Sequence, residues 1–132
     1  MIKRKLERYA QILNNIDDDQ DKYVWLMDFG KNSIPMKDDH KIEEFEVNGC
    51  QTVTWLVPHY VEDKIYFSAD SMALISRGMV CLIADVYSGS LAQDIFDFDQ
   101  DEFKMLKLDT LLTPGRNNGV YSMLKLVKDY AS

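Results

Sequence analysis

The sequence predicts an α+β fold, in which a small antiparallel sheet is packed among several helices. Apolar residues recur at helical spacing in residues 1–30 and again beyond residue 70, whereas they alternate with polar residues between residues 43 and 68. The chain has 132 residues, of which 46% are hydrophobic, so a core of ordinary size can form without disulfides or a structural metal. We therefore expect a single domain that spans residues 1–132.

Two helices are predicted before the sheet. The first ends near Asn14, and its apolar face consists of Ile2, Leu6, Tyr9, Leu13 and Ile16. The second follows the acidic residues 17–21, whose charge complements the positive end of the helix dipole. Gly30 stands where a C-terminal cap is expected, and residues 31–41, which include Pro35, are predicted to form a loop.

Three consecutive strands are predicted in the middle of the chain. Phe45 and Val47 alternate with glutamates in the first strand. Asn48-Gly49 predicts a type I′ hairpin turn, because both residue types tolerate a positive φ. The returning strand is expected over about residues 51–57 and the third over residues 64–68. Together they predict an antiparallel meander.

Cap signals predict further helices in the second half of the chain. Side-chain oxygens at a helix start accept hydrogen bonds from the first free amides, so such residues mark N-termini. The expected starts are Asp70 or Ser71, Ser90 with Gln93, Asp99 with Glu102, and Thr113 with Pro114. Gly89 is expected to end the first and longest of these helices.

Charge and composition exclude several classes of function. The chain has 22 acidic and 15 basic residues, a net charge of −7, and no Lys/Arg-rich stripe, so we expect no binding to nucleic acid or to a membrane surface. The basic residues 3–5 are not followed by the apolar segment of a secretory signal, and no apolar run is long enough for a membrane span. Only two cysteines are present, which favours a reducing compartment, and we predict a cytoplasmic location.

Neither a metal site nor a cofactor site is expected. Asp17, Asp19 and Asp21 match the first ligands of an EF-hand loop, but Lys22 replaces its glycine and Asp28 its terminal glutamate. The cysteines and histidines lack the local spacing of a zinc site; they are His40, Cys50, His59 and Cys81. The chain also has no glycine-rich phosphate loop and no G-x-S-x-G motif.

The two cysteines stand in different contexts. Cys81 lies within an apolar helical run and is expected to pack as a small hydrophobic residue. Cys50 directly follows the predicted tight turn, where backbone N–H groups that converge on the sulfur would favour the thiolate. The residues alone leave two interpretations equally open for Cys50: a nucleophile, or a thiol that packs at the start of a strand.

Four segments carry motifs that occur together in one known family. They are residues 49–55 (GCQTVTW), 22–30 (KYVWLMDFG), 70–78 (DSMALISRG) and 112–119 (LTPGRNNG). The first resembles the G-C-Q-S-x-V-W signature of the SufE/CsdE family of sulfur acceptors in iron–sulfur cluster assembly. The others resemble that family's K-Y-x-x-[IL]-x-[ED]-L-G, D-S-x-A-x-I-x-[KR]-G and L-T-P-x-R-x-x-G motifs, in the same order and spacing. Together they span nearly the whole chain.

The resemblance implies a fold and an activity. The family has a SufE/IscU-like fold, with helices around a curved three-stranded antiparallel sheet. Its members take sulfane sulfur from a pyridoxal-phosphate cysteine desulfurase of the SufS or CsdA type and pass it to a scaffold such as the SufBCD complex. Carried over, Cys50 is the acceptor and becomes a persulfide, and the chain acts as a sulfurtransferase-type carrier only together with the desulfurase, which holds the cofactor. We expect the Cys50 side chain to be shielded until docking.

Other matched positions are candidate supporting residues. With Gly49 in the turn, Gln51 and Thr52 are expected to hydrogen-bond around the sulfur, or only to provide polarity at the start of a strand. Arg116 lies in the first turn of a helix, where a cation is disfavoured, so it is expected to pair with a carboxylate or to support the Cys50 thiolate.

Three further matched positions are expected to be structural. Asp70 is expected to act as an N-cap, with a supporting role near the cysteine loop as the alternative, and Trp55 is expected to lie in the core. Gly119 suggests a close backbone approach.

The sequence departs from the family pattern at three positions, and it leaves alternatives open. Thr52 replaces the usual serine, Thr54 a valine and Ala69 a glycine, which puts the identity of the partner in doubt more than the chemistry. One alternative is a non-covalent adaptor that activates a desulfurase, and another is sulfur relay to a non-cluster thiolation pathway. An IscU-type scaffold would need three cysteine ligands. The oligomeric state, including a homodimer, stays open.

Overall fold

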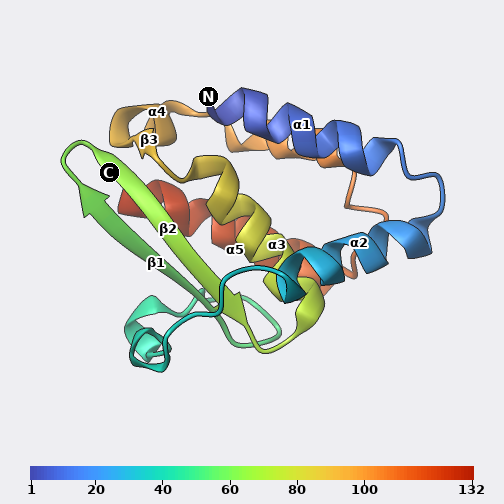
Figure 1. Cartoon of the computed structure of the whole chain (residues 1–132), viewed down its shortest axis with the longest axis horizontal. Helices are drawn as coiled ribbons and strands as arrows, with labels where there is room; N and C mark the ends of the chain where they lie inside the picture. Colours follow the sequence, from blue (N-terminus) through green and yellow to red (C-terminus); the bar gives the residue numbers. More distant parts are fainter.

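The computed structural model describes all residues, 1–132, and confirms the α+β class. Five α-helices surround a three-stranded antiparallel sheet (Figure 1). The elements are α1 (Ile2–Asn14), α2 (Asp19–Lys31), the 3₁₀ helices η1 (Asp38–His40) and η2 (Glu43–Phe45), β1 (Thr54–Val61), β2 (Lys64–Ser71), α3 (Leu74–Tyr87), β3 (Ser90–Leu91), α4 (Ala92–Asp97), the 3₁₀ helix η3 (Gln100–Leu106) and α5 (Pro114–Tyr130). None of the helices has the length and apolar character needed to cross a membrane.

The sheet differs from the predicted meander. Its order is β1-β2-β3, and β1 and β2 form a long hairpin in which Val61 pairs with Lys64. The predicted first strand is wrong: Glu43–Phe45 is a 3₁₀ helix, and only an isolated bridge between Glu46 and Trp55 is present. Phe45 packs over the outer face of the sheet instead, so the alternation of apolar and acidic residues is satisfied without strand pairing. The third strand is β3, which is only two residues long.

The type I′ turn is also wrong. Gly49 has a positive φ of 95°, but Asn48 does not, whereas a type I′ turn needs both. The backbone closes further out, where the Val47 amide donates to the Thr54 carbonyl at 2.8 Å. Cys50 therefore lies in a wider loop of residues 48–53, which we call the Cys50 loop, rather than at the tip of a tight hairpin.

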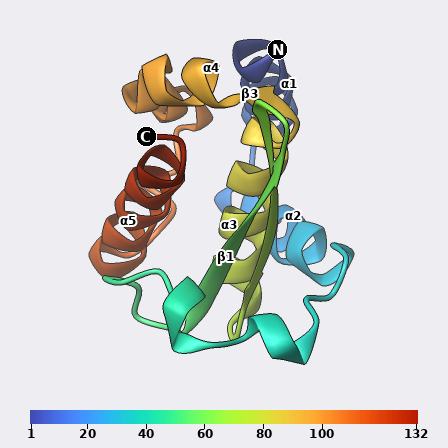
Figure 2. The same cartoon turned by 90° about the vertical axis from the view of Figure 1, so that its left-hand side faces the viewer.

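Helix α3 is the centre of the fold, and it contacts α1, α2, α5 and the inner face of the sheet (Figure 2). Its closest neighbour is α2, because Gly30 and Gly78 lie at the crossing of the two helices. A Cβ added to Gly78 would lie 2.0 Å from the Leu26 carbonyl oxygen. Gly30 is thus a buried packing residue inside α2. The prediction that it caps the helix is wrong, because the C-cap is Asn32.

Two of the predicted helix starts are confirmed. The side chains of Asp99 and Thr113 accept hydrogen bonds from the first turns of η3 and α5. Asp70 and Ser71 are not caps, because β2 continues through Ser71 and α3 begins only at Leu74. Ser90 belongs to β3, so its predicted capping box with Gln93 is wrong as well; Leu91 precedes α4 without a side-chain cap.

Candidate functional site

Cys50 lies in a small pocket between the Cys50 loop and two helices. Its Sγ is 3.8 Å from the carbonyl oxygen of Gly119 in α5, to which the thiol donates, and the side chain is half-buried. Residues from the loop, α3 and α5 line the pocket with it: Gln51, Ile75, Ser76, Met79, Arg116, Gly119, Val120 and Met123. The start of α5 is therefore the surface that faces the thiol.

Two glycines let α5 approach the loop. A Cβ on Gly119 would lie 3.2 Å from the Cys50 sulfur, so the expectation of a close backbone approach at this residue is confirmed. A Cβ on Gly115 would lie 2.2 Å from the Gln51 side-chain nitrogen. Thr113 caps α5 through its hydroxyl and Pro114 fixes the first turn, so local sequence positions both glycines against the loop.

Replacing Gly119 with alanine is expected to push the thiol outwards. The added methyl group is too close to Sγ, and the loop can give way more easily than the helix. Alkylation of Cys50 by iodoacetamide should become roughly threefold faster as its exposure rises. The free energy of unfolding should change by less than about 1 kcal/mol, because the higher helix propensity of alanine offsets the cost of crowding the sulfur. Buried Cys81 provides the internal reference, and an unchanged rate at Cys50 would contradict this account of the pocket.

The electrostatics of the thiol differ from the sequence-based expectation. Burial raises the pKa of the Cys50 thiol, while a hydrogen bond with the Thr54 side chain lowers it by a smaller amount. The sulfur donates to a carbonyl instead of accepting from converging amides, so the prediction that the loop favours the thiolate is wrong. Because the loop is wider than a type I′ turn, its backbone N–H groups do not converge on the Cys50 sulfur as such a turn would have allowed.

A pH dependence follows from this raised pKa. The folded state favours the neutral thiol, so its contribution to stability is complete below the ordinary thiol pKa and is lost as the pH rises through the folded value. The alkylation rate of Cys50 should therefore rise at higher pH in the folded protein than in the urea-unfolded chain. Rates from about pH 7 to about pH 10 check this. A folded profile whose rate rises at the same pH as the unfolded one, or at a lower pH, would overturn it.

The other predicted polar residues of the site are placed as follows. Arg116 lines the pocket and donates to the Ser76 hydroxyl at 2.6 Å, without a carboxylate partner. Gln51 lines the pocket against Gly115, and the Thr52 carbonyl accepts from the Thr54 hydroxyl at 3.0 Å.

Sequence reasoning missed the role of Thr54. It is fully buried and also bonds to the Ser71 hydroxyl at 2.9 Å. The available signal was a hydroxyl at a position where the matched motif has a valine.

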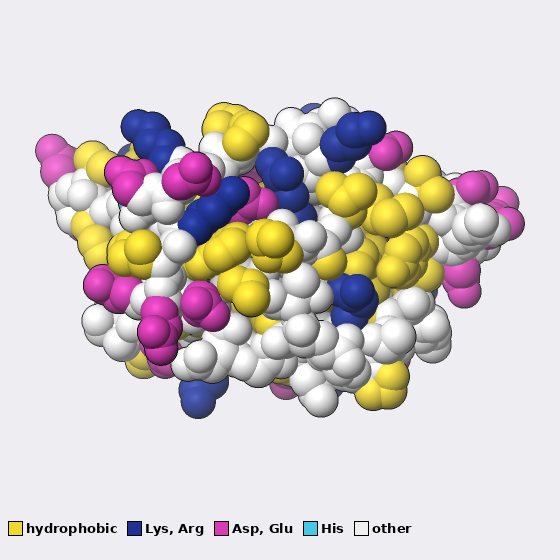
Figure 3. Space-filling view, turned by 90° about the horizontal axis from the view of Figure 1, so that it is seen from below, with side chains coloured by type: hydrophobic (Ala, Val, Ile, Leu, Met, Phe, Trp, Pro, Cys, Tyr) yellow, Lys and Arg dark blue, Asp and Glu magenta, His cyan; other side chains and the backbone are white.

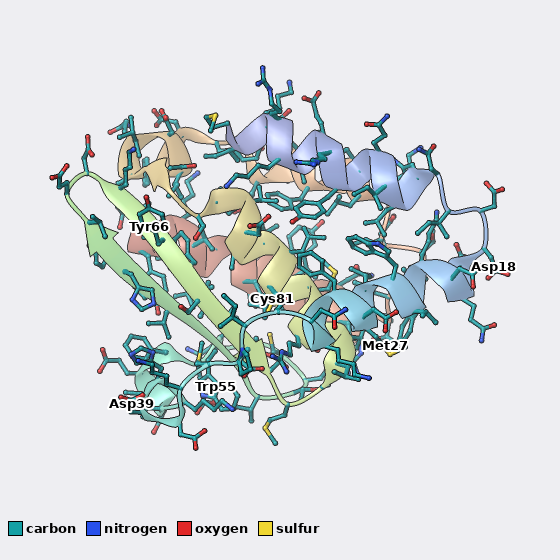
Figure 4. All side chains as sticks on the ribbon, viewed as in Figure 1. Asp18, Met27, Asp39, Trp55, Tyr66 and Cys81 are labelled. Carbon is teal, nitrogen blue, oxygen red and sulfur yellow. The ribbon has the colours of Figure 1, made fainter.

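Asp70 lies outside the Cys50 pocket and organises the other face of the sheet. Its buried carboxylate pairs with Arg77 Nε at 3.2 Å and with Lys41 Nζ at 3.5 Å, and it accepts from the Ser71 amide at 2.7 Å. Lys41 also lies over the ring of Trp55, 5.6 Å from its centroid. Trp55 is buried at this end of the sheet, as predicted (Figure 4). Asp70 thus ties residues 36–41 to α3.

Replacing Asp70 with asparagine is expected to destabilise the fold by about 2–3 kcal/mol, because two cations lose their partner. The value lies at the lower end of the range for buried pairs, since the Lys41 side chain is 30% exposed. Urea unfolding measures the change. Asp38 is the matched control, because it pairs with the same lysine but is fully exposed, and Asp38→Asn should have no measurable effect. Equal effects of both substitutions would refute the buried role of Asp70.

The remaining titratable candidates form no metal site. No group of three His, Cys, Asp or Glu residues lies close enough together to hold an ion. The rings of His40 and His59 do lie together, with centroids 5.8 Å apart. Cys81 is buried, as predicted, and donates to the Ala69 carbonyl at 3.5 Å.

Comparison with known proteins decides the family. The family model described as "SufE: Fe-S metabolism associated domain" matches residues 7–131. The chain belongs to the SufE family. It is 30% identical over 128 residues to SufE-like protein 1, chloroplastic/mitochondrial, of Arabidopsis thaliana, covering 96% of this chain but only 34% of that protein. It is 33% identical over 121 residues to an uncharacterised SufE-like protein of Rhizobium etli, covering 88% of this chain and 82% of that protein.

A solved structure has a similar fold. The solution structure of a hypothetical protein from Thermus thermophilus superposes with a TM-score of 0.77 and covers 96% of this chain and 93% of its own. At 15% identity this likeness concerns the fold alone. Membership of the SufE family associates the chain with iron–sulfur metabolism.

Proposed function

We propose that this SufE-family chain carries sulfur from a cysteine desulfurase to iron–sulfur cluster assembly, with Cys50 as the acceptor. The Cys50 thiolate attacks the sulfane sulfur of the desulfurase persulfide, and a new S–S bond forms as the old one breaks. The desulfurase cysteine leaves as a thiolate and takes up the proton that Cys50 gave up. No electrons are gained or lost overall, so the transfer needs no cofactor on this chain.

The observation that carries this proposal is the isolation of one nucleophile in a shielded pocket. No other cysteine lines the Cys50 pocket, and Cys81 is buried against the Ala69 carbonyl. A neighbouring thiol would attack the persulfide, form a disulfide and release the sulfur. Half-burial against α5 also limits access by small thiols. Both features suit a persulfide that must survive transfer between proteins.

Docking must open the pocket, because the half-buried neutral thiol is a weak nucleophile. Three apolar side chains at the end of the Cys50 loop and next to it are exposed: Val53 at 44%, Met72 at 71% and Leu74 at 46%. Hydrophobic side chains are visible on this lower face of the molecule (Figure 3). A desulfurase of the SufS or CsdA type that covers them could move the loop, which is joined to this patch by the bond from the Met72 amide to the Val53 carbonyl.

The proposal extends to the setting of the transfer. We assign residues 1–132 to one SufE-like domain that works in the cytoplasm and delivers sulfur to a SufBCD-type scaffold. Gln51, Thr52 and Arg116 support the loop around Cys50, while Gly49 forms its turn. Asp70 supports the site from outside the pocket, through its pairs with Arg77 and Lys41.

The raised pKa and half-burial of Cys50 favour one alternative, a non-covalent adaptor that activates the desulfurase. Counting product in the absence of reductant separates the two functions. Each carrier chain takes one sulfur, so the burst of alanine from a desulfurase should grow by about one per added chain. An adaptor would speed the burst without enlarging it, and that result would reject the carrier.

A further inference from the structure

A second cavity, larger than the Cys50 pocket, lies along β2, and its lining also includes His59 of β1 and Tyr9 of α1. It has a volume of about 640 Å³ and is bounded by β2, α3, the end of α2 and residues 32–37. Cys81, which lies between β2 and α2 in Figure 4, is among its lining residues. It shares no lining residue with the Cys50 pocket. Its size is within the range of sites that bind ligands.

The cavity follows a free edge of the sheet. β3 pairs only with Lys64 and Ile65, so residues 66–71 of β2 have no strand neighbour on that side. Val61 pairs with Lys64 across a two-residue turn, so the backbone groups of alternate residues from Lys64 onwards bond to β1. The backbone groups of Phe67 and Ala69 therefore point to the free edge, and both residues line the cavity.

Side chains occupy two of these four edge groups. The Phe67 amide donates to the Ser88 hydroxyl at 2.8 Å, and the Ala69 carbonyl accepts from the Cys81 thiol at 3.5 Å. The Phe67 carbonyl and the Ala69 amide have no partner in the protein. Phe67 is 9% exposed and Ala69 7%, and polar backbone groups at such depth are costly to leave without a hydrogen bond.

The two free groups have the pattern of a parallel ladder. In a parallel pair, each bonding residue of the incoming strand lies opposite one residue of the existing strand. Its amide donates to the carbonyl of the residue that precedes this opposite residue, and its carbonyl accepts from the amide of the residue that follows it. The Phe67 carbonyl and the Ala69 amide flank Ser68 in this way. An antiparallel strand would need the Phe67 amide or the Ala69 carbonyl, which side chains already bind. The edge is therefore prepared for a parallel strand.

The side chains beside Ser68 indicate what the incoming strand carries there. Residues opposite one another in a sheet point to the same face, and the Ser68 hydroxyl bonds to His59 Nε2 at 2.9 Å. His40 lies against His59, and Lys37 also lines the cavity. The only carboxylate in the lining is Asp85, which accepts from the Tyr9 hydroxyl. In a chain with a net charge of −7, this set of side chains favours an acidic residue opposite Ser68.

We propose that the cavity binds an extended segment of a partner protein, which adds to β2 as a parallel strand with an acidic residue opposite Ser68. Backbone hydrogen bonds supply part of the affinity in such strand addition, and the side-chain pockets supply the specificity. The site is separate from Cys50 and does not depend on sulfur transfer.

Nuclear magnetic resonance of the whole chain tests the proposal with the probe acetyl-Val-Glu-Val-amide. In the free protein, the Ala69 amide should exchange with solvent faster than the amides of Ser68 and Asp70, which bond to β1. The probe should shift and protect the Ala69 amide. The same peptide methylated on the glutamate nitrogen loses the donor to the Phe67 carbonyl and should bind about tenfold more weakly.

Matched variants locate the site. Lys37→Glu should weaken the probe roughly threefold, whereas the exposed Lys64, outside the cavity, is the control and Lys64→Glu should leave binding unchanged. Cys50→Ser should also leave it unchanged. The proposal is overturned if the Ala69 amide of the free protein is as protected as that of Asp70. It is equally overturned if the two peptides bind alike, or if neither perturbs Ala69 at about 10 mM, a concentration well above the fragment range.

Discussion

Replacing Cys50 with serine is expected to abolish stimulation of the desulfurase and to return its turnover to the value of the desulfurase alone. A serine hydroxyl is close in size to the thiol and should keep the loop against Gly119, but it cannot accept sulfane sulfur at neutral pH. Because the transfer has one nucleophile, no other group in the pocket can replace it. The measurement is the rate of alanine release with reductant present, as a function of added chain.

Cys81→Ser is the matched control for this experiment. It removes the only other thiol, which is buried at the second cavity and faces the Ala69 carbonyl. Stimulation should survive, with at most a small loss of stability. If Cys50→Ser still stimulates as well as the unchanged chain, the carrier is wrong and the adaptor is right. If Cys81→Ser abolishes stimulation while the protein stays folded, the acceptor has been assigned to the wrong cysteine.

Replacing Gly78 with alanine is expected to destabilise the fold about as much as replacing Asp70 with asparagine. The added Cβ would lie 2.0 Å from the Leu26 carbonyl oxygen and 2.8 Å from its carbonyl carbon. Both are backbone atoms of α2, so no side chain can move aside and the two helices must separate. Overpacking against fixed backbone costs about 3 kcal/mol, the upper end of the usual range, which outweighs the gain of about 1 kcal/mol in helix propensity. Thermal unfolding should show a decrease in Tm of roughly 5–10 °C.

Gly115→Ala is the control for the helix-propensity term. Its Cβ also meets atoms at close range, but these belong to the Gln51 side chain, which is exposed and can swing away. We expect its Tm to stay within about 3 °C of the unchanged chain. A Gly78→Ala variant as stable as Gly115→Ala would show that α2 and α3 can separate without loss, against the packing described above.

The helices could be predicted from the sequence better than the sheet. Apolar periodicity located α1 and α5, because each of these helices buries one stripe of residues against the core. It also located α3, although this central helix is buried on nearly all sides. The alternation of apolar and acidic residues around Phe45 led to a false strand. A loop that packs Phe45 and Met36 against a sheet and exposes most of the residues between produces the same alternation. β3 is two residues long, and it pairs with Lys64 and Ile65 from a distant part of the chain, a contact that no local pattern contains.

The site shows the same division between local and distant information. Cys50 and the approach of Gly119 were found from motifs, and the cap at Thr113 from local chemistry. The partners of Asp70 were not, because Lys41 and Arg77 come from different segments and meet only in the folded chain. The direction of the shift in the Cys50 pKa was also predicted wrongly, because the shift depends on a distant segment: burial against α5 raises the pKa more than the side-chain hydrogen bond lowers it.

Intact mass spectrometry tests the central claim most directly. The chain is mixed with a cysteine desulfurase and cysteine, separated from the enzyme, and measured before and after treatment with reductant. We expect a gain of one sulfur atom that maps to the peptide containing Cys50 and is lost on reduction. A chain that stimulates the desulfurase but never gains this mass, or gains it on Cys81, would contradict the assignment of Cys50 as the sulfur acceptor.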